Sequence, residues 1–328
     1  MERRKLGRTG LAVSVLGFGC GAVGGLMVRG EPKDQERAVA HAVELGINYF
    51  DTAAFYGDGL SETNLGRVLA ALRPDVLVGT KFRVSPTDRG RMGEAISASL
   101  EASLKRLRRE QVDLLQLHNE ISAGGRSDDL SAALVLEEVV PALEHLKRQG
   151  KIRFFGITAK GDTDALHKVI DRGALDTTQV IYNLLDPSAG AALPAGFPAQ
   201  DFARLLDAAK AARTGVLVIR VLAGGALSGS AERHPLGSPK PPPMATGPDY
   251  GDDVRRARSL LPLVQEGHAT DLVEASLRFA VAHDAVATVL VGVSTIAQLD
   301  HAAAAIAKGP LSQAALQRLA QLHAAFAA

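Results

Sequence analysis

Hydrophobic and polar residues follow two alternating patterns along this chain. Short runs of Val, Ile, Leu and Phe without regular polar interruption indicate strands that are buried on both faces. Longer segments place apolar residues three and four positions apart, as amphipathic helices do. The strands predicted in this way are 15–19, 47–50, 76–81, 113–118, 152–157, 177–182, 215–221 and 286–291. The predicted helices are 34–45, 62–72, 93–109, 132–149, 162–172, 199–213, 270–283, 296–307 and 312–327.

The regular alternation of strands and helices predicts parallel strand–helix–strand units. Eight buried strands in one chain of 328 residues match the number and size of a closed (β/α)8 TIM barrel, an α/β fold. We therefore expect a single domain that covers residues 1–328. Two short strands around the turn at Thr9 and Gly10 predict a β-hairpin ahead of the barrel. The helices at 296–307 and 312–327 are the expected C-terminal additions.

One long segment, Ser230–Asp253, has no hydrophobic periodicity and is rich in Pro and Gly. It follows the seventh predicted strand, so it should lie at the carboxyl end of the barrel. Long loops inside compact domains are often functional, and we interpret this one as a flap over a site. A mobile surface insertion is the alternative.

Composition narrows the class of protein. The 37 Lys and Arg residues nearly balance the 36 Asp and Glu residues, so no strong field attracts nucleic acid or an anionic membrane. Cys20 is the only cysteine, which excludes an intramolecular disulfide. The N-terminus resembles no signal peptide, and apolar runs fall well short of the ~18 residues that span a bilayer. A cytoplasmic protein is expected, and its oligomeric state stays open.

Polar side chains follow three of the predicted strands, where barrels carry their active sites. Asp51 follows the strand at 47–50 and Tyr56 lies in the next turn, whereas Lys81 and His118 end two later strands. A phenol is a weak acid, and a neighbouring ammonium held by a carboxylate makes proton donation easier. An imidazole beside them could orient a carbonyl oxygen or relay a proton. This set suits protonation of an oxygen that gains negative charge as hydride reaches its carbon.

Each of these residues taken alone also has an ordinary structural interpretation. Asp51 could cap the next turn, Lys81 could be a paired lysine and His118 a satisfied structural histidine. Their shared placement favours the catalytic interpretation. A metal-dependent hydrolase on the same barrel is less favoured, because no His-x-His pair ends a strand, and we predict no metal.

Several ordered motifs resemble the aldo-keto reductase family almost from end to end. They are R-K-L-G-R-T-G-L-A-V-S-V-L-G-F-G at the start, G-I-N-Y-F-D-T-A-A-F-Y-G-D-G-L-S-E-T-N-L-G, V-G-T-K-F, L-K-R-L-R-R-E-Q-V-D-L-L-Q-L-H-N, G-K-I-R-F-F-G-I-T and V-L-A-G-G-A-L-S-G. The resemblance implies a barrel that binds an extended nicotinamide cofactor, NADP(H) or NAD(H), at its carboxyl face. It implies that Tyr56 donates the proton and that Lys81 and Asp51 make this donation easier. It also implies that His118 helps to bind the carbonyl group.

The same resemblance assigns cofactor contacts. Thr158 and Gln179 stand where the family holds the nicotinamide carboxamide. The positions that imply contacts to the diphosphate are Leu222, Gly224, Leu227 and Ser228, and those near the adenosine are Ser294 and Gln298.

The chain departs from the family pattern at three places. Ala159 replaces the common asparagine after Thr158. Ile219 and Arg220 stand near the usual aromatic partner of the nicotinamide, so Tyr182 is a candidate replacement. Thr295 stands where a basic residue often meets the 2′-phosphate of NADP, which makes NAD a serious alternative.

The function predicted from these residues is NAD(P)-dependent interconversion of an aldehyde or ketone and an alcohol. Alternatives are an NAD-dependent aldose or alcohol dehydrogenase and a non-catalytic regulatory protein that binds the cofactor. The substrate is expected to be a small molecule. Residues expected to line its pocket are Phe18, Phe55, Phe82 and Asn119, with ordinary core positions as the alternative for the three phenylalanines. Arg83 could meet an anionic substrate, and the alternative is a solvated side chain.

Overall fold

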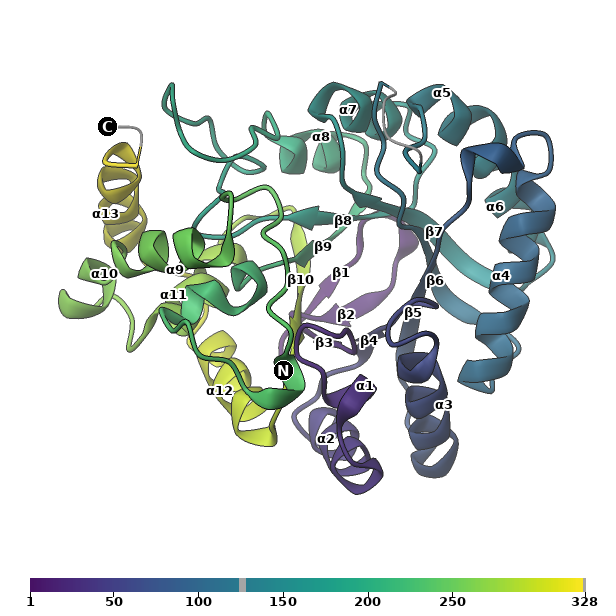
Figure 1. Ribbon diagram of the computed structural model, residues 1–328, viewed down its shortest axis with the longest axis horizontal. Helices are drawn as coiled ribbons and strands as arrows, with labels where there is room; N and C mark the ends of the chain where they lie inside the picture. Colours follow the sequence, from purple (N-terminus) through teal and green to yellow (C-terminus); the bar gives the residue numbers. More distant parts are fainter. Residues whose placement is uncertain (124–127, 327–328) are drawn as a thin grey trace.

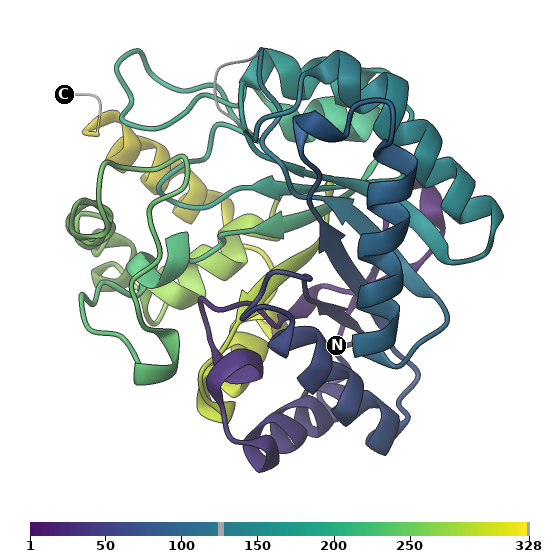
Figure 2. The same ribbon diagram turned by 45° about the vertical axis from the view of Figure 1, so that its right-hand side comes forward.

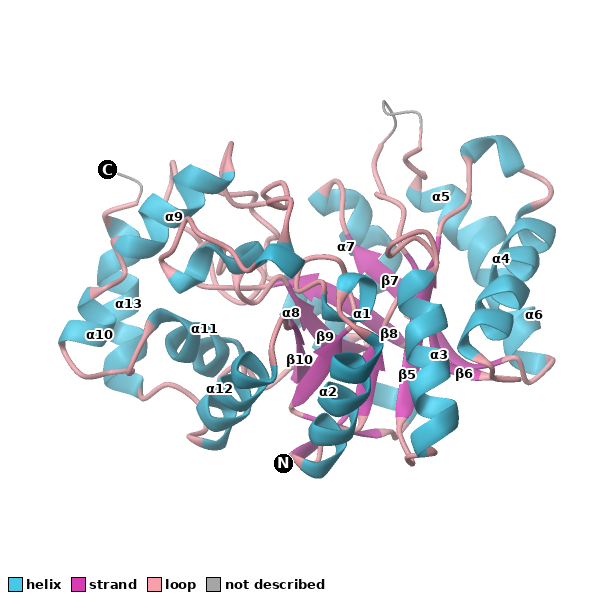
Figure 3. Ribbon diagram, turned by 60° about the horizontal axis from the view of Figure 1, so that its bottom comes forward, coloured by secondary structure: helices cyan, strands magenta, loops and turns pink. Residues whose placement is uncertain are grey.

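The computed structural model describes residues 1–123 and 128–326, and its centre is a closed barrel of eight parallel strands (Figures 1 and 3). Each strand pairs with its neighbours in the chain, and the last pairs with the first, as predicted. The barrel strands are β3 (Leu16–Gly19), β4 (Tyr49–Asp51), β5 (Leu77–Phe82), β6 (Val112–Leu117), β7 (Ile152–Ala159), β8 (Thr177–Ile181), β9 (Gly215–Ile219) and β10 (Val286–Gly292).

The predicted N-terminal hairpin is confirmed, and it closes one end of the barrel. Strands β1 (Arg3–Lys5) and β2 (Ala12–Ser14) pair in antiparallel register, with Arg4 opposite Val13. Its apolar side chains form a separate core cluster with residues from inside the barrel: Leu6, Leu11, Val13, Tyr49, Leu114, Leu217, Ala287 and Leu290. Gly7 has a φ of +50°, and a Cβ there would overlap the backbone of Gly215, so this close approach requires glycine. Because the hairpin covers the amino end, the site must open at the carboxyl end.

The helices surround the barrel and bury their apolar faces against it (Figures 1 and 3). Those between the first strands are α2 (Pro32–Glu44), α3 (Leu60–Leu72), α4 (Met92–Leu107), α6 (Val140–Arg148), α7 (Thr163–Asp171) and α8 (Leu205–Ala211). The later ones are α9 (Tyr250–Arg258), α10 (Pro262–Gln265), α11 (Leu272–Ala280), α12 (Ile296–Ala307) and α13 (Gln313–Ala324). Helices α9, α10 and α13 gather on one side of the molecule, and the same grouping is visible after a turn in Figure 2.

Three predicted segments differ from the observed ones. The helix predicted at 132–149 begins with a short α-helical turn, α5 (Ala132–Leu134), and a π-helical turn at Val135–Val139 before α6. The helix predicted at 199–213 is confined to α8, because Ala203 and Arg204 adopt positive φ values and break the helical path. The last four residues of the loop predicted at 230–253 belong to α9, where the Asp249 side chain accepts a hydrogen bond from the backbone N–H of Asp252 and caps the helix.

Besides α9, the short α-helices α1 and α10 were not predicted. Helix α1 (Leu26–Arg29) lies between β3 and α2, and α10 lies between α9 and α11. Each has only four residues, which is too short for an amphipathic period to be visible in the sequence. In the described residues, no helix is both long enough and apolar enough to cross a lipid bilayer.

Candidate functional site

A buried ion pair lies at the carboxyl end of the barrel. Asp51, the last residue of β4, is 4% exposed, and Lys81 on the neighbouring strand β5 is 1% exposed. The Lys81 ammonium contacts Asp51 Oδ1 directly and also donates to the backbone carbonyl of Thr52 at 2.8 Å. Burial lowers the pKa of Lys81, but the charge of Asp51 and the contact with Tyr56 outweigh it, so the pKa lies above its usual value. Lys81 is therefore a positive charge at neutral pH.

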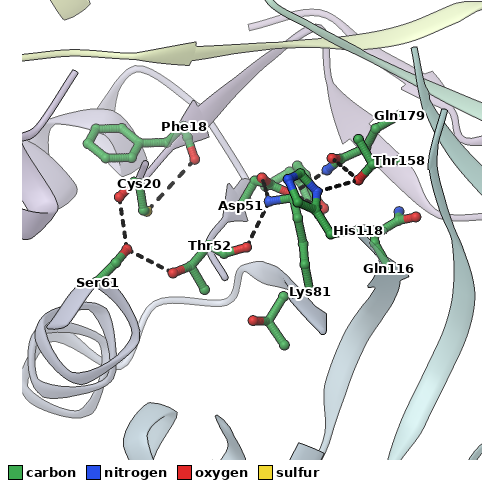
Figure 4. A network of polar contacts seen from close by, with 12 residues as sticks. Phe18, Cys20, Asp51, Thr52, Ser61, Lys81, Gln116, His118, Thr158 and Gln179 are labelled. Atoms are coloured by element: carbon green, nitrogen blue, oxygen red, sulfur yellow. Dashed lines mark hydrogen bonds and ion pairs between the residues drawn. The ribbon is translucent and has the colours of Figure 1, made fainter. Parts of the chain in front are cut away.

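Asp51 is also the start of a hydrogen-bond chain that crosses the barrel (Figure 4). Gln179 Nε2 on β8 donates to Asp51 Oδ2 at 2.7 Å, and Thr158 Oγ1 on β7 donates to Gln179 Oε1 at 3.1 Å. The same Thr158 hydroxyl lies 2.9 Å from His118 Nδ1, at the end of β6. The chain joins the side chains of four strands, and so it holds three of the predicted catalytic groups in one rigid network.

The chain of hydrogen bonds from Asp51 to His118 determines which ring nitrogen of neutral His118 carries the hydrogen. Gln179 must present its NH2 group to the Asp51 carboxylate, so its oxygen is the acceptor for Thr158. The single hydrogen of the Thr158 hydroxyl is then used, and the hydroxyl can only accept from His118 Nδ1–H. The reverse arrangement would leave Gln179 Oε1 buried without a donor, at a cost of about 1–3 kcal/mol. Neutral His118 therefore has Nε2 as a hydrogen-bond acceptor.

His118 is neutral because it is buried among cations. Burial lowers the pKa of its imidazole well below the usual value, and the positive charges of Lys81, Lys160, Arg83 and Arg220 lower it further. Its ring lies 4.8 Å from the ring of Phe55, centroid to centroid.

Tyr56 lies above the ion pair in the turn between β4 and α3. Its ring centroid is 4.8 Å from Lys81 Nζ, and the edge of its ring meets Phe55, with 5.2 Å between the centroids. A second set of hydrogen bonds fixes this turn: the hydroxyls of Thr52 and Ser61 are 2.8 Å apart, and Ser61 donates to the carbonyl of Cys20 (Figure 4). The structure thus brings together all four residues that the sequence predicted as catalytic.

A cavity of about 580 Å³ begins at Tyr56 and His118 and extends along the carboxyl ends of β9, β10 and β3. Gly19, Gly21 and Gly24 form one wall, and side chains of the 230–253 segment, including Met244 and Tyr250, form another. The segment therefore lies over the site, as expected of a flap. A wider groove beside it is lined by Arg83 and Lys160, and Met244 borders both spaces.

The predicted cofactor contacts divide into two groups. The residues that line the cavity are Gln179, Leu222, Gly224, Ser228, Ser294 and Gln298. Thr158 and Leu227 are fully buried behind its wall. Thr295, at the predicted position of a phosphate-binding cation, instead caps α12 by accepting a hydrogen bond from the backbone N–H of Gln298 at 3.2 Å.

Several predicted pocket residues are placed elsewhere, and those predictions were wrong. Phe18 and Phe82 are each 1% exposed and belong to the apolar core. Asn119 uses its amide to bind the backbone of Val84 and the carbonyl of Asp128. Tyr182 packs against Phe279, with 4.7 Å between the ring centroids, and does not line the cavity.

The sequence did not predict that Arg220 and Arg233 line the cavity, although Arg220 was noted as a departure from the family pattern. Arg233 ties three loops together, because it donates to the carbonyls of Gly224, Gly237 and Val23 and to the Tyr250 hydroxyl. A cation directly after a barrel strand is the one signal that could have drawn attention to Arg220.

A buried carboxyl group supports the loop beside this wall and gives a pH-dependent prediction. Burial raises the pKa of Asp186 to about 7, although Ser188 donates two hydrogen bonds to its Oδ1. Folding thus favours the protonated form, and the stabilisation that it brings is largest below pH ~4 and is lost as the pH rises through 7. Asp186→Asn should remove this dependence. We expect the variant to gain about 2–4 kcal/mol relative to wild type between pH 4.5 and 8.5, from the size of the shift.

Urea unfolding at the two pH values measures this difference. Asp201→Asn is the matched control, because Asp201 also accepts a backbone hydrogen bond but is exposed. Parallel stability curves for wild type and Asp186→Asn across this pH range would contradict the prediction.

Comparison with known proteins agrees with this fold and site. The model of the aldo/keto reductase family matches residues 15–324. L-Galactose dehydrogenase from Arabidopsis thaliana is 32% identical over 311 residues, which cover 93% of this chain and 88% of that protein. D-threo-Aldose 1-dehydrogenase from a Pseudomonas species is 34% identical over 57% of this chain and 63% of its own length. The holo form of aldo-keto reductase AKR11C1 from Bacillus halodurans superposes with a TM-score of 0.71 and 27% identity, covering 100% of this chain and 97% of that one.

The chain belongs to the aldo/keto reductase family. It is an NAD(P)H-dependent oxidoreductase, with a barrel that carries the polar network described above at its carboxyl end.

Proposed function

We propose that this enzyme interconverts a carbonyl compound and its alcohol, with Tyr56 as the group that donates and accepts the proton. The observation that carries the proposal is the charged Lys81–Asp51 pair buried directly beneath the Tyr56 ring. When bound, a nicotinamide cofactor supplies or accepts the hydride. The protein must then supply or remove one proton at the substrate oxygen, and Tyr56 is the hydroxyl that lies at the inner end of the cavity.

The role of Lys81 follows from electrostatics. As Tyr56 gives up its proton it becomes negative, and the ammonium beside its ring, on a lysine that is 1% exposed, stabilises that charge more strongly than it would in water. Asp51 keeps the ammonium charged and fixed, and Gln179 and Tyr49 donate to its second oxygen. Because these groups are already in place, little reorganisation accompanies proton transfer.

The cavity also fits a nicotinamide dinucleotide. It is elongated, its glycine wall leaves room for close approach, and polar side chains lie at both ends. We propose that Gln179 holds the carboxamide at the inner end with Thr158 supporting it from behind. At the other end Ser294 and Gln298 would contact the adenosine, and Leu222, Gly224, Leu227 and Ser228 would form the turn around the diphosphate.

The outer end of the cavity supports a preference for NAD over NADP. The lining residues there are Ser294, Ala297, Gln298, His301 and Ala302, and among these no lysine or arginine faces a 2′-phosphate. The Nε2 atom of His301 lies 3.0 Å from a carboxylate oxygen of Asp271, so this nitrogen is already engaged. We expect NADH to bind at least as tightly as NADPH.

Fluorescence titration with each reduced cofactor measures this preference. NADPH binding more than tenfold tighter than NADH would contradict the NAD preference. Failure to bind either cofactor would contradict the proposed function itself.

A specific observation favours an aldose or alcohol as the physiological substrate. His118 offers Nε2 as an acceptor, which suits a hydroxyl hydrogen of the substrate better than a second carbonyl lone pair. Relatives named as L-galactose and D-threo-aldose dehydrogenases support the same direction. Rates of NAD reduction with a panel of aldoses and simple alcohols test it, and exclusive turnover of substrates without neighbouring hydroxyls would contradict it.

A further inference from the structure

Arg220 occupies a constrained position in the cavity wall. It follows β9 directly and lies between Tyr56 and the turn at 223–228, and its φ is +55°. Left-handed backbone is uncommon for a residue with a long side chain and is kept where the surroundings impose it. Here the Arg220 carbonyl accepts hydrogen bonds from Asn183 Nδ2 at 3.0 Å and from the backbone N–H of Ala223 at 2.7 Å. The fold therefore holds this residue in place at a local cost.

The guanidinium of Arg220 has few protein partners. Its Nη1 donates to the carbonyl of Pro242 at 3.2 Å, and it forms no other hydrogen bond and no ion pair with residues 1–123 or 128–326. Yet the residue is half-buried, and burial lowers the pKa of its guanidinium from the usual value. Withdrawing a cation from water without a carboxylate partner costs free energy unless something else provides negative charge.

A second cation, Arg233, adds to the positive charge at this wall of the cavity. Arg233 lines the same cavity, and its positive charge also lowers the pKa of Arg220. Its own donors are engaged by backbone carbonyls and by the Tyr250 hydroxyl. Asp253 is the carboxylate that acts on Arg220, but it accepts a hydrogen bond from Thr246 and pairs with Arg256 at 3.9 Å. Two guanidiniums thus border one cavity that Asp51 and Glu232 also line, and within the described residues neither guanidinium forms an ion pair.

The space beside Arg220 is shaped by glycine. A Cβ on Gly224 would lie 3.0 Å from Arg220 Nη1 and 2.8 Å from the side chain of Pro241, so any larger residue would displace the guanidinium. Arg220 and Gly224 line the same cavity as Tyr56, Gln179 and Ser294. A dinucleotide with its nicotinamide at Gln179 and its adenosine at Ser294 would place the diphosphate between these two ends.

We propose that Arg220 anchors the diphosphate of the nicotinamide cofactor, between its guanidinium and the turn at 223–228. This rests on the proposed function. A planar guanidinium binds two phosphate oxygens at once, and such charge-assisted pairs are strong where water is excluded. The hydrogen bond to Pro242 joins the same group to the 230–253 segment, so an anion held by Arg220 also lies against the flap.

Binding of cofactor fragments to Arg220→Gln tests the proposal without turnover. ADP-ribose contains the diphosphate and no nicotinamide, whereas adenosine contains neither. We expect Arg220→Gln to weaken ADP-ribose and NADH by about 10- to 100-fold, the usual weight of a charge-assisted hydrogen bond, and to leave adenosine binding unchanged. Arg220→Lys should recover part of the loss, because it keeps the charge without the planar fork.

Arg255→Gln is the matched control for loss of one positive charge. Arg255 lies on α9, is exposed, pairs with Asp252 and does not line the cavity. Its replacement should leave all three dissociation constants unchanged, measured by isothermal titration calorimetry. Circular dichroism of each variant verifies that the fold is intact.

The outcomes separate this inference from the proposed function. Equal ADP-ribose affinity in wild type and Arg220→Gln would overturn the inference. So would an unchanged ADP-ribose affinity together with a raised KM for substrates that carry a carboxylate or phosphate, because the guanidinium would then serve the substrate. Wild-type protein that binds neither NADH, NADPH nor ADP-ribose would overturn both proposals together.

Discussion

Replacing Tyr56 with phenylalanine is expected to lower kcat at least about a hundredfold, the usual weight of a general acid or base. This corresponds to about 2.7 kcal/mol of lost transition-state stabilisation. The loss arises because the proton at the substrate oxygen would have to come from water instead of from a positioned hydroxyl group. Lys81 loses its contact with the Tyr56 hydroxyl but keeps those with Asp51 and the carbonyl of Thr52, and Gln179 still donates to Asp51, so the ion pair and the hydrogen-bond chain should survive the change. Steady-state kinetics and the dissociation constant for NADH measure the two expectations.

Tyr182→Phe is the matched control for the loss of a phenol. Tyr182 is buried, packs against Phe279 and lies away from the cavity, so its replacement should leave kcat within a few-fold of wild type, as is usual for changes remote from a site. An unchanged kcat in Tyr56→Phe would sink the proposed mechanism. An equal loss in both variants would point to a general effect on the fold instead.

Replacing Lys81 with methionine is expected to damage both activity and stability. Methionine keeps most of the side-chain volume but removes the ammonium, so the Asp51 carboxylate is left buried with Gln179 and Tyr49 as its neutral donors. Removal of one partner of a buried ion pair typically costs about 3–5 kcal/mol in the free energy of unfolding. The kcat should fall by about a hundredfold or more, because the charge that stabilises a developing phenolate is lost.

The double variant Lys81→Met with Asp51→Asn separates these two effects. It removes the uncompensated carboxylate, and an asparagine can still accept a hydrogen bond from Gln179. We therefore expect most of the lost stability to return while kcat stays low. Denaturant unfolding and steady-state kinetics of wild type and the two variants measure this, and recovery of kcat together with stability would show that Lys81 has only a structural role.

The sequence by itself was sufficient for the architecture and for the four residues at the strand ends. Strand and helix periodicities are local properties, and eight alternating units leave little choice but a closed parallel barrel. Because the carboxyl ends of all its strands meet at one face, Asp51, Lys81 and His118 could be placed together before any contact was known. The motifs that resemble the family then supplied the expected roles.

The tertiary structure decided what depends on contacts between distant segments. Gln179 meets Asp51 across 128 positions of sequence, and through Thr158 this contact sets which nitrogen of His118 carries the hydrogen. No periodicity encodes such a contact, because it depends on which side chains point inward at matching heights in the barrel. The same reason explains why Phe18 and Phe82 proved to be core residues. It also explains why only the packing of the 230–253 segment against β9 reveals Arg220 as a half-buried cation without an ion-pair partner among the described residues.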